Sequence, residues 1–304
     1  MPGSSFGEYL TVSTFGESHG AAVGVVVDGV PPGLALTIED IQRDLDRRRP
    51  GQSGVTSARR EFDRAELLSG LFEGTTTGTP IAIVIRNEEH RSSDYERFHD
   101  AFRPGHADWT YQAKYGIRDW RGGGRSSGRE TAARVAAGAI ARKILSGHGI
   151  AVTGYALEIA GIRAGSLDLA EVERNPVRCA DAAAAALMER AISEAKDAGD
   201  SVGGVVEVVA EGVPAGLGDP VFDKLEALLA HALLSVGAVR GFEIGAGFDA
   251  ARMRGSAFND ELAPGSGGAR LRIPAVTGPS GGIDTHFARI AAPATAARPH
   301  RRPR

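Results

Sequence analysis

The sequence contains a single cysteine among its 304 residues, and only four of its 35 basic residues are lysines. One cysteine, Cys179, excludes a framework of internal disulfide bonds and is typical of a reducing compartment, so we expect a cytoplasmic location. No apolar run approaches the roughly 18–20 residues that a membrane-spanning helix needs. The first residues also lack the charged and apolar regions of a signal peptide. The net charge of −3 argues against a membrane or a nucleic acid as the partner.

Two kinds of ligand-binding signature are also missing. No cysteine or histidine spacing offers a zinc site, so we expect no metal. No P-loop lysine follows a glycine loop, and no strand leads into the glycine signature of dinucleotide-binding folds. The hydrophobic content of 42% and the charged content of 24% are nevertheless those of a globular domain.

A glycine- and arginine-rich segment, residues 121–134, is the strongest indication of a ligand site. Ser127 lies three residues before Glu130, which has the form of a capping box and predicts a helix from near Gly128. The glycine loop and the helix N-terminus can present N–H groups and partial positive charge to an anion. Three arginines bring fixed cations to the same end: Arg125, Arg129 and Arg134. The segment predicts a phosphate site, and an ordinary capped helix with a flexible entry loop is the alternative.

An internal sequence repeat predicts that the chain consists of two related β-α halves. Residues 24–34 and 207–217 each contain a β-branched run, an acidic residue and Gly-Val-Pro-x-Gly-Leu, which predicts a buried strand and a sharp turn. Helices are expected next, over residues 38–48 and 220–234. Further strands are expected over residues 7–14, 80–86, 150–159 and 240–247. The pattern indicates an α+β fold with strand layers around a helical interior, and a chance match of the turn motif is the alternative.

Two histidines in glycine-containing turns are candidates for proton transfer. His19 follows Ser18 at the end of an expected strand, and His106 lies in a Pro-Gly turn. Imidazole titrates near neutral pH, so these residues together with the arginine clusters suggest acid catalysis on a phosphorylated substrate. Taken singly, either histidine can be structural or merely exposed. Residues 86–127, polar but containing several aromatics, are expected to form an ordered active-site segment.

A second arginine cluster, residues 46–51, closes the first expected helix. Cations normally complement a helix C-terminus, but we expect Arg48 or Arg49 to reach an anionic ligand as well. The Arg-Gly-Gly-Gly-Arg sequence also resembles RNA-binding tracts. A single copy in a net acidic chain makes that alternative weak.

Together these motifs resemble chorismate synthase. The resemblance is carried, in the family's order, by residues 14–20 (TFGESHG), 27–33 (VDGVPPG), 46–51 (DRRRPG), 102–108 (FRPGHAD), 121–127 (RGGGRSS), 129–134 (RETAAR) and 212–217 (GVPAGL). It implies a lyase that converts 5-enolpyruvylshikimate 3-phosphate to chorismate and phosphate by anti-1,4-elimination. It also implies reduced FMN as cofactor, NADPH as a candidate source of its electrons, and a single-domain sandwich of sheet layers that assembles as a homotetramer.

The resemblance also assigns roles to individual residues. His19 would protonate the departing phosphate and His106 the reduced flavin, with Ser18 and Ser127 in the same polar network. The residues expected to bind the anionic substrate are Arg48, Arg49, Arg129 and Arg134. Those expected to contact FMN are Arg125, Ser126, Ser127, Gly237 and Ala238. Gly237 stands where the family commonly has asparagine, so only backbone contacts are expected there.

The family pattern is expected to end at about residue 262. Residues 1–262 would form the chorismate synthase-like domain, and residues 263–304 an Arg/Pro/Ala-rich tail without a stable fold. The family's Lys-Pro-Thr and Arg-His-Asp-Pro motifs do not occur in the tail. A shift of reading frame near residues 262–268 is one hypothesis, and a natural basic tail is the other. The alternative function is then a catalytically impaired remnant that only binds anions or flavin, or only oligomerises.

Overall fold

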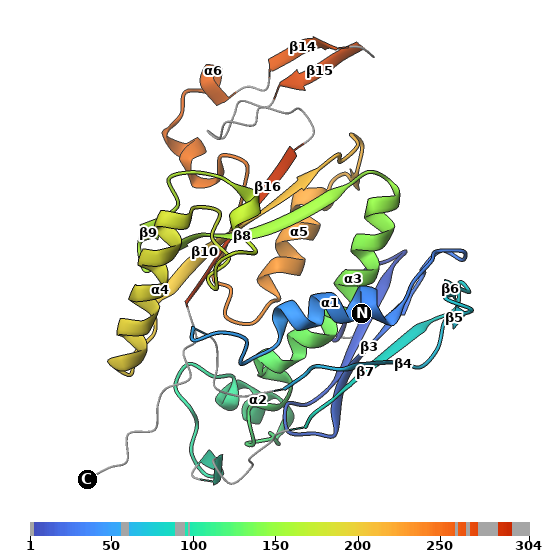
Figure 1. Ribbon diagram of the computed structural model, residues 1–304, viewed down its shortest axis with the longest axis vertical. Coiled ribbons are helices and arrows are strands. Elements are labelled where there is room, and N and C mark those ends of the chain that lie inside the picture. Colours follow the sequence, from blue (N-terminus) through green and yellow to red (C-terminus); the bar gives the residue numbers. More distant parts are fainter. Residues whose placement is uncertain are drawn as a thin grey trace. The chain divides into compact units, whose positions relative to one another are not determined.

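The computed structural model describes residues 3–55, 61–88, 95–96, 98–258, 261–265, 268–272 and 285–293. Its backbone divides into two compact units, Met1–Leu145 and Ser146–Arg304, each with a five-stranded sheet (Figure 1). The mixture of sheets and helices confirms the α+β class. Both units differ in extent from the expected domain 1–262, whose boundary stays a prediction.

The first unit is built on an antiparallel sheet with the strand order β1-β2-β3-β7-β4. The strands are β1 (Ser5–Phe6), β2 (Thr11–Gly16), β3 (Ala22–Asp28), β4 (Ala65–Leu67) and β7 (Ile81–Arg86). In β3 the side chains of Val23, Val25 and Val27 are all fully buried, because alternate residues of a strand face the same side. The sheet therefore presents one continuous apolar face to the helices.

Helices and short turns complete the first unit. They are α1 (Ile38–Arg48), α2 (Asp108–Tyr115), α3 (Thr131–Gly147), the 3-10 turns Gly124–Ser126 and Gly128–Glu130, and the two-residue strands β5 (Leu71–Phe72) and β6 (Thr75–Thr76). Ile41 and Leu45 of α1 and the alanines and Ile140 of α3 share one core with β3 and β7. The alanine-rich face of α3 is consistent with close packing, since small side chains let a helix approach its neighbours.

The second unit has the strand order β13-β16-β10-β8-β9. Its sheet is formed by β8 (Ala151–Ile159), β9 (Ile162–Arg163), β10 (Gly203–Glu211), β13 (Gly241–Ile244) and β16 (Thr285–Pro293). Its other elements are α4 (Ala182–Asp197), α5 (Leu225–Leu234), α6 (Gly255–Phe258), the 3-10 turns Leu169–Glu171 and Gly247–Arg252, and the hairpins β11 (Gly218–Asp219) with β12 (Asp223–Lys224) and β14 (Glu261–Gly265) with β15 (Gly268–Arg272). A smaller core gathers around Tyr155, Leu157 and Val209.

The structure confirms some expected elements and corrects others. The helix expected over residues 38–48 is confirmed, and Thr37 and Asp40 form its capping box. The expected helix start near Gly128 is a 3-10 turn instead, and the α-helix begins at Thr131. The expected helix over 220–234 is wrong at its start, because the β11–β12 hairpin occupies that stretch and α5 begins at Leu225.

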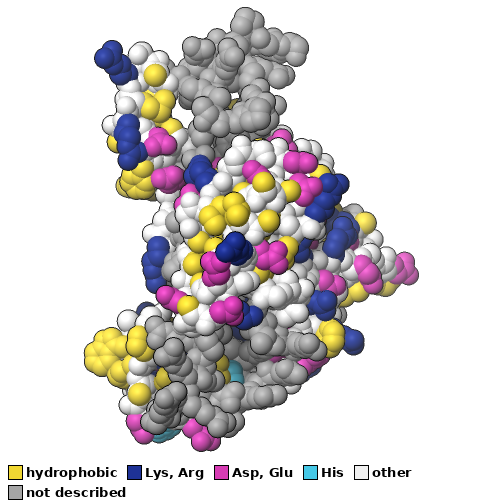
Figure 2. All heavy atoms as spheres, turned by 60° about the vertical axis from the view of Figure 1, so that its left-hand side comes forward, with side chains coloured by type: hydrophobic (Ala, Val, Ile, Leu, Met, Phe, Trp, Pro, Cys, Tyr) yellow, Lys and Arg dark blue, Asp and Glu magenta, His cyan; other side chains and the backbone are white. Residues whose placement is uncertain are grey.

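The segment after residue 262, for which the sequence predicts no stable fold, contains part of β14, all of β15 and all of β16. β16 pairs antiparallel with both β10 and β13. No helix in the described ranges has the length and apolar character to cross a bilayer. On the face drawn in Figure 2, acidic and basic side chains are interspersed, as the small net charge would suggest.

Candidate active site

The turn between β2 and β3 carries the first histidine. It is closed by a hydrogen bond from the amide of Gly20 to the carbonyl of Glu17, at 3.1 Å. The His19 side chain is buried, and its ring meets that of Tyr95 edge to face with 5.0 Å between centroids. Ser18 is only 1% exposed, and its hydroxyl has no hydrogen-bond partner in the described part of the chain. A buried hydroxyl without a partner is unfavourable and needs an explanation.

The glycine loop lies directly against this turn. Gly122 has φ +62°, and a Cβ there would stand 2.1 Å from the His19 ring and 2.8 Å from the Ser18 hydroxyl. The amide of Ser18 donates to the carbonyl of Gly124 at 3.4 Å. Only glycine therefore fits at position 122, and two motifs about a hundred residues apart in sequence meet around His19.

The second histidine lies in a turn fixed by Arg103 and Asp108. Nε and Nη2 of Arg103 donate to the two Asp108 carboxylate oxygens at 2.9 and 2.8 Å, and the Arg103 amide donates to the same carboxylate. The His106 amide donates to the Arg103 carbonyl at 3.3 Å. The Arg103 guanidinium also lies over the Tyr95 ring, 5.6 Å from its centroid. Tyr95 thus contacts both His19 and the motif that contains His106.

Burial and nearby charged groups shift the pKa values of His106 and Asp108 in this turn. The pKa of His106 is lowered, first by protein atoms that displace water around the ring and then by the Arg103 charge, with Asp108 acting in the opposite direction. Burial alone would raise the pKa of Asp108, but hydrogen bonds from Arg103 and the charge of Arg118 hold it below its usual value. A lowered pKa leaves His106 mostly neutral at pH 7.

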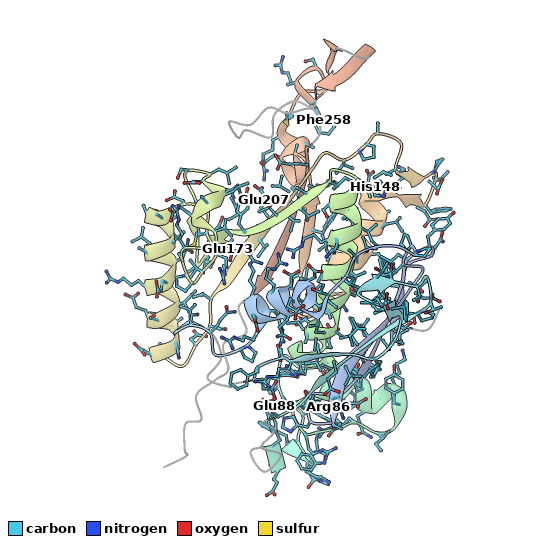
Figure 3. All side chains as sticks on the ribbon, turned by 45° about the vertical axis from the view of Figure 1, so that its right-hand side comes forward. Arg86, Glu88, His148, Glu173, Glu207 and Phe258 are labelled. Atoms are coloured by element: carbon cyan, nitrogen blue, oxygen red, sulfur yellow. The ribbon has the colours of Figure 1, made fainter. Side chains whose placement is uncertain are left out.

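A buried charge cluster surrounds Arg129, which is 4% exposed. One terminal nitrogen of its guanidinium contacts the carboxylates of Glu61, at 2.8 Å, and Asp63. Nε donates to Oδ1 of Asn87 at 2.8 Å, and the other terminal nitrogen donates to the carbonyl of Arg86 at 3.2 Å. Arg86 is the last residue of β7 (Figure 3), so the cluster lies at the end of this strand of the first unit's sheet.

Arg48 joins the same cluster through Asp63. Its guanidinium donates to the second Asp63 oxygen at 2.7 Å, to the Gly128 carbonyl at 2.9 Å and to the Thr131 hydroxyl at 3.3 Å. Asp63 therefore bridges Arg48 and Arg129, which lie 81 residues apart in the sequence. Two guanidinium groups face two carboxylates, so the cluster is close to electroneutral.

The other expected substrate-binding arginines, Arg49 and Arg134, make contacts with residues outside this cluster. The Arg49 guanidinium lies over the ring of Phe62, 5.9 Å from its centroid. Arg134 pairs with Glu130 one helical turn earlier, at 3.0 Å. Glu130 thus points along the helix rather than back to the amide of Ser127, and the Ser127 hydroxyl accepts from the amide of Arg129 rather than from that of Glu130, so the expected capping box does not form.

The residues expected to contact FMN are held by protein groups. Arg125 donates to the carbonyl and hydroxyl of Thr14 and to the carbonyl of Gly16, both in β2. The Ser126 hydroxyl donates to the carbonyl of Gly123 at 2.7 Å. The Ser127 hydroxyl accepts from the amide of Arg129 at 3.3 Å. Gly237 and Ala238 belong to the second unit, in the turn after α5, where Ala238 has φ +70°.

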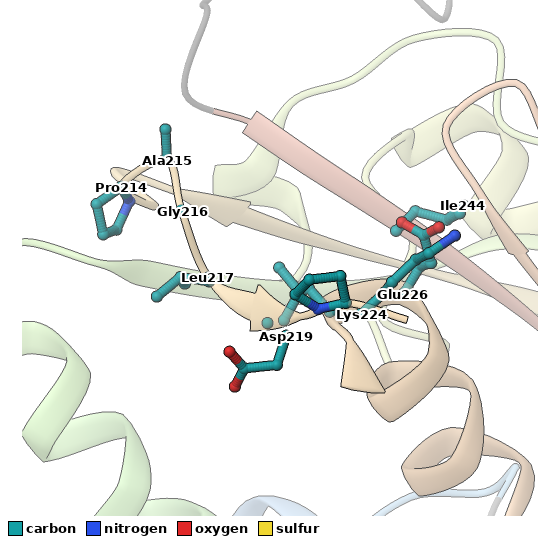
Figure 4. Close-up of a pocket in the computed structure, with 11 residues that line it drawn as sticks. Pro214, Ala215, Gly216, Leu217, Asp219, Lys224, Glu226 and Ile244 are labelled. Atoms are coloured by element: carbon teal, nitrogen blue, oxygen red, sulfur yellow. The ribbon is translucent and has the colours of Figure 1, made fainter. Parts of the chain in front are cut away.

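A hollow of about 400 Å³ opens in the second unit, and it contains none of these residues (Figure 4). It is lined by the second copy of the turn motif, by the β11–β12 hairpin and by Ile244. Its charged lining residues are Asp219, Lys224 and Glu226. The hollow offers no imidazole or guanidinium group.

Sequence reasoning missed five residues of the site: Glu61, Asp63, Asn87, Tyr95 and Arg103. Arg103 lies inside the motif 102–108 without having been singled out, Asn87 and Tyr95 lie in the expected active-site segment 86–127, and Glu61 and Asp63 lie outside every motif. The only available signal was the rule that buried arginines need carboxylates. That rule does not say which carboxylates supply the pairing.

Comparison with known proteins places the chain in a family. A family model described as chorismate synthase matches residues 10–289, which is further than the sequence motifs were expected to reach. The chorismate synthase of Syntrophobacter fumaroxidans is 60% identical over 284 residues, 93% of this chain and 81% of that protein. The protein of that name from Methanosarcina mazei is 59% identical over 266 residues, 86% of this chain and 73% of its own.

A solved structure agrees with these sequence relatives. A crystal structure of chorismate synthase superposes with a TM-score of 0.77 at 34% identity, covering 94% of this chain and 85% of that one. The shared fold and the shared sequence therefore point to one lyase activity, the step of the shikimate pathway that forms chorismate. The chain belongs to the chorismate synthase family.

Proposed function

We propose that this chain eliminates phosphate from 5-enolpyruvylshikimate 3-phosphate at the site around His19, with that imidazole donating a proton to the departing phosphate. The single observation that carries the proposal is the buried imidazole beside the Ser18 hydroxyl, which has no partner among the described residues, and the glycine loop at Gly122. In the net reaction the bond between ring carbon and phosphate oxygen breaks and a proton is released from the ring carbon at the other end of the 1,4 relationship. The existing carbon–carbon double bond shifts and one more forms, which gives a conjugated diene and phosphate. A proton delivered to the leaving oxygen lowers the charge that must develop there.

The arginines divide this work between them. Because Glu61 and Asp63 already balance Arg48 and Arg129, a bound dianion needs further positive charge. Arg49 and Arg134 are the candidates, since Arg49 lies against an aromatic ring and Arg134 forms a partly exposed helical pair. Arg48 and Arg129 would then present fixed N–H groups rather than free charge.

The same surroundings fit a polar cofactor group. The absence of a side chain at Gly122 lets the loop lie directly against the His19 ring, and the Ser18 hydroxyl beside it lacks a partner in the described part of the chain. Arg125, Ser126 and Ser127 would hold FMN. Reduced FMN, when bound, supplies the electronic part of the elimination without net oxidation.

His106 is proposed to hold the proton that keeps the reduced flavin in its working form. Its lowered pKa means that the protonated ring is a minority at pH 7 and a readier donor when present. We further propose NADPH as an electron source for the flavin, a homotetrameric assembly and a cytoplasmic location. The family resemblance supports the first two. The third is supported by the single cysteine, a buried thiol whose pKa is raised by burial.

Chorismate absorbance during anaerobic incubation with substrate and reduced FMN tests the proposal. We expect turnover by the wild-type chain and a loss of at least about a hundredfold in His19→Gln. His148→Gln is the matched control, because His148 is exposed after the end of α3 (Figure 3). Flavin binding without turnover in the wild-type chain would contradict the proposal and favour an impaired remnant.

A further inference from the structure

The buried side-chain amide of Asn87 connects the His19 turn with Arg129. Asn87 follows β7 directly and is 9% exposed. Its backbone amide donates to the carbonyl of Ala21 at 3.1 Å, which ties it to the start of β3. None of the sequence motifs contains it, and the proposed chemistry does not use it.

The Asn87 side chain forms hydrogen bonds with two different parts of the first unit, the His19 turn and Arg129. Nδ2 donates to the carbonyls of Glu17, at 2.9 Å, and Gly20, at 2.8 Å, which flank Ser18 and His19. Oδ1 accepts from Nε of Arg129 at 2.8 Å. Both hydrogens of the amide and one of its acceptor sites are therefore in use.

These partners also fix the orientation of the amide. A flipped side chain would turn its oxygen toward two carbonyls and its N–H groups toward the N–H of Arg129, and every one of these contacts would be repulsive. The same contacts also restrict which residue type can stand at position 87. Aspartate offers acceptors only, and alanine offers neither donor nor acceptor. Asparagine is the residue that meets both sides at once.

We propose that Asn87 is a positioning residue that holds the His19 turn at a fixed place relative to Arg129. This inference rests on the proposed function only for the role of the His19 turn in proton donation. The clamp acts through backbone carbonyls on either side of His19, so it sets where the imidazole stands without touching the substrate. A displacement of about 1 Å of a reacting group can cost about a hundredfold in rate, which makes such a clamp consequential.

Two substitutions separate the two sides of the clamp. Asn87→Asp keeps an acceptor for Arg129 but places a carboxylate against the carbonyls of Glu17 and Gly20, so the turn should open. We expect kcat to fall by about ten- to a hundredfold while KM stays within about twofold. Asn87→Ala removes both sides, and we expect KM to rise as well.

Asn175 supplies a matched control in the second unit. Its Nδ2 donates to the carbonyls of Glu171 and Cys179, both at 2.8 Å, and its Oδ1 accepts from the Cys179 amide at 3.0 Å. Asn175→Asp breaks the same kind of clamp in the other unit, among residues to which no role in the reaction is assigned. We expect it to lower the melting temperature about as much as Asn87→Asp while leaving kcat unchanged.

Hydrogen exchange of the Gly20 amide tests the clamp without any turnover. We expect its exchange rate to rise at least about tenfold in Asn87→Asp and to stay at the wild-type value in Asn175→Asp. Unchanged Gly20 exchange with unchanged kcat would overturn the proposal. Complete unfolding of Asn87→Asp beside a folded Asn175→Asp would assign Asn87 to folding and overturn it too. A wild-type chain without turnover would refute the proposed function, and the exchange result would still decide the clamp.

Discussion

The two copies of the Gly-Val-Pro-x-Gly-Leu segment, one in each unit, take the same backbone path and then diverge. Gly29 and Gly212 occupy the same place in the two copies, with φ +83° and +73°. A Cβ at either would collide with a backbone carbonyl, 1.8 Å from that of Tyr9 in one case and 2.3 Å from that of Gly149 in the other. Gly33 and Gly216 also match, with φ +85° and +95° and open space around them. In both copies, therefore, the first glycine permits the close approach of a distant backbone segment, and the second is needed only for its positive φ.

The elements that come after the turn differ between the copies. After the first, the capping box of Thr37 starts α1 almost at once, and Ile41 and Leu45 are fully buried. After the second, the β11–β12 hairpin intervenes, and α5 has no buried residue. Only the first copy leads into an arginine cluster, because α1 ends at Arg48. The same turn thus leads to the buried arginine cluster in one unit and to a short hairpin in the other.

We expect the largest loss of stability when Asp63 of the first unit is replaced, and a much smaller loss for Asp181 of the second unit. Asp63 pairs with two guanidinium groups, so Asp63→Ala leaves buried positive charge and should lower the free energy of unfolding by about 3–5 kcal/mol. Both tryptophans, Trp109 and Trp120, belong to the first unit, so their fluorescence during urea unfolding reports on it directly. A midpoint within error of the wild-type value would contradict the assigned pairing.

A smaller effect should appear equally in both copies of the turn. Gly29→Ala and Gly212→Ala each introduce a backbone collision at positive φ, and we expect a loss of about 2–4 kcal/mol. Gly33→Ala and Gly216→Ala are the controls, because they add only the strain of positive φ, about 1–2 kcal/mol. Urea denaturation checks the order, and equal losses in all four variants would break the correspondence between the copies.

Asp181 gives a weaker and pH-dependent contrast to Asp63. It accepts the amides of Ala183 and Ala184 at the start of α4 and those of Gly165 and Ser166, and these bonds hold its pKa at about 2. Asp181→Ala should cost about 1 kcal/mol at pH 7. Because the folded pKa is below the ordinary 3.8, this stabilisation is present above about pH 4 and lost as the pH falls toward 2.

The comparison of wild type with Asp181→Ala across pH checks that sign. Urea midpoints of the two proteins should converge between pH 4 and pH 2. A gap that stays constant or widens on acidification would contradict the assigned hydrogen bonds.

The smallest effect concerns the protonation of His106. Burial is the first cause of the lowered His106 pKa and the Arg103 charge the second, so Arg103→Gln should raise the pKa part of the way while the carboxylate of Asp108 remains. Nuclear magnetic resonance titration of the histidine ring measures the shift, with His148 in the same sample as the internal reference. An unchanged or lower His106 pKa would show that Arg103 does not set it.

The sequence predicted the parts of the fold that depend on near neighbours. The helix over 38–48 follows from Thr37 and Asp40, and the buried strand β3 from its valines. The start of α5 was missed because a hairpin of polar residues leaves no periodic pattern, and Pro220 looked like a helix start. Local propensity yields to such tertiary pairing.

The candidate site was predictable in its motifs and not in its partners. His19, Ser18 and the glycine loop were named from sequence, and the structure brings them into contact. Asp63 and Asn87 act across 15–70 residues of sequence, through contacts that only the folded chain creates. Nor could the sequence show that Arg125 is bound to β2.

Single-turnover chorismate formation by Gly122→Ala tests the central claim most directly. A Cβ at that position would occupy the space of the His19 ring, whereas Gly74→Ala, at similar positive φ, has nothing within 4 Å. If the glycine loop and the His19 turn form the active site, Gly122→Ala loses at least about a hundredfold in rate and Gly74→Ala keeps nearly all of it. Wild-type turnover by a folded Gly122→Ala protein would contradict the account.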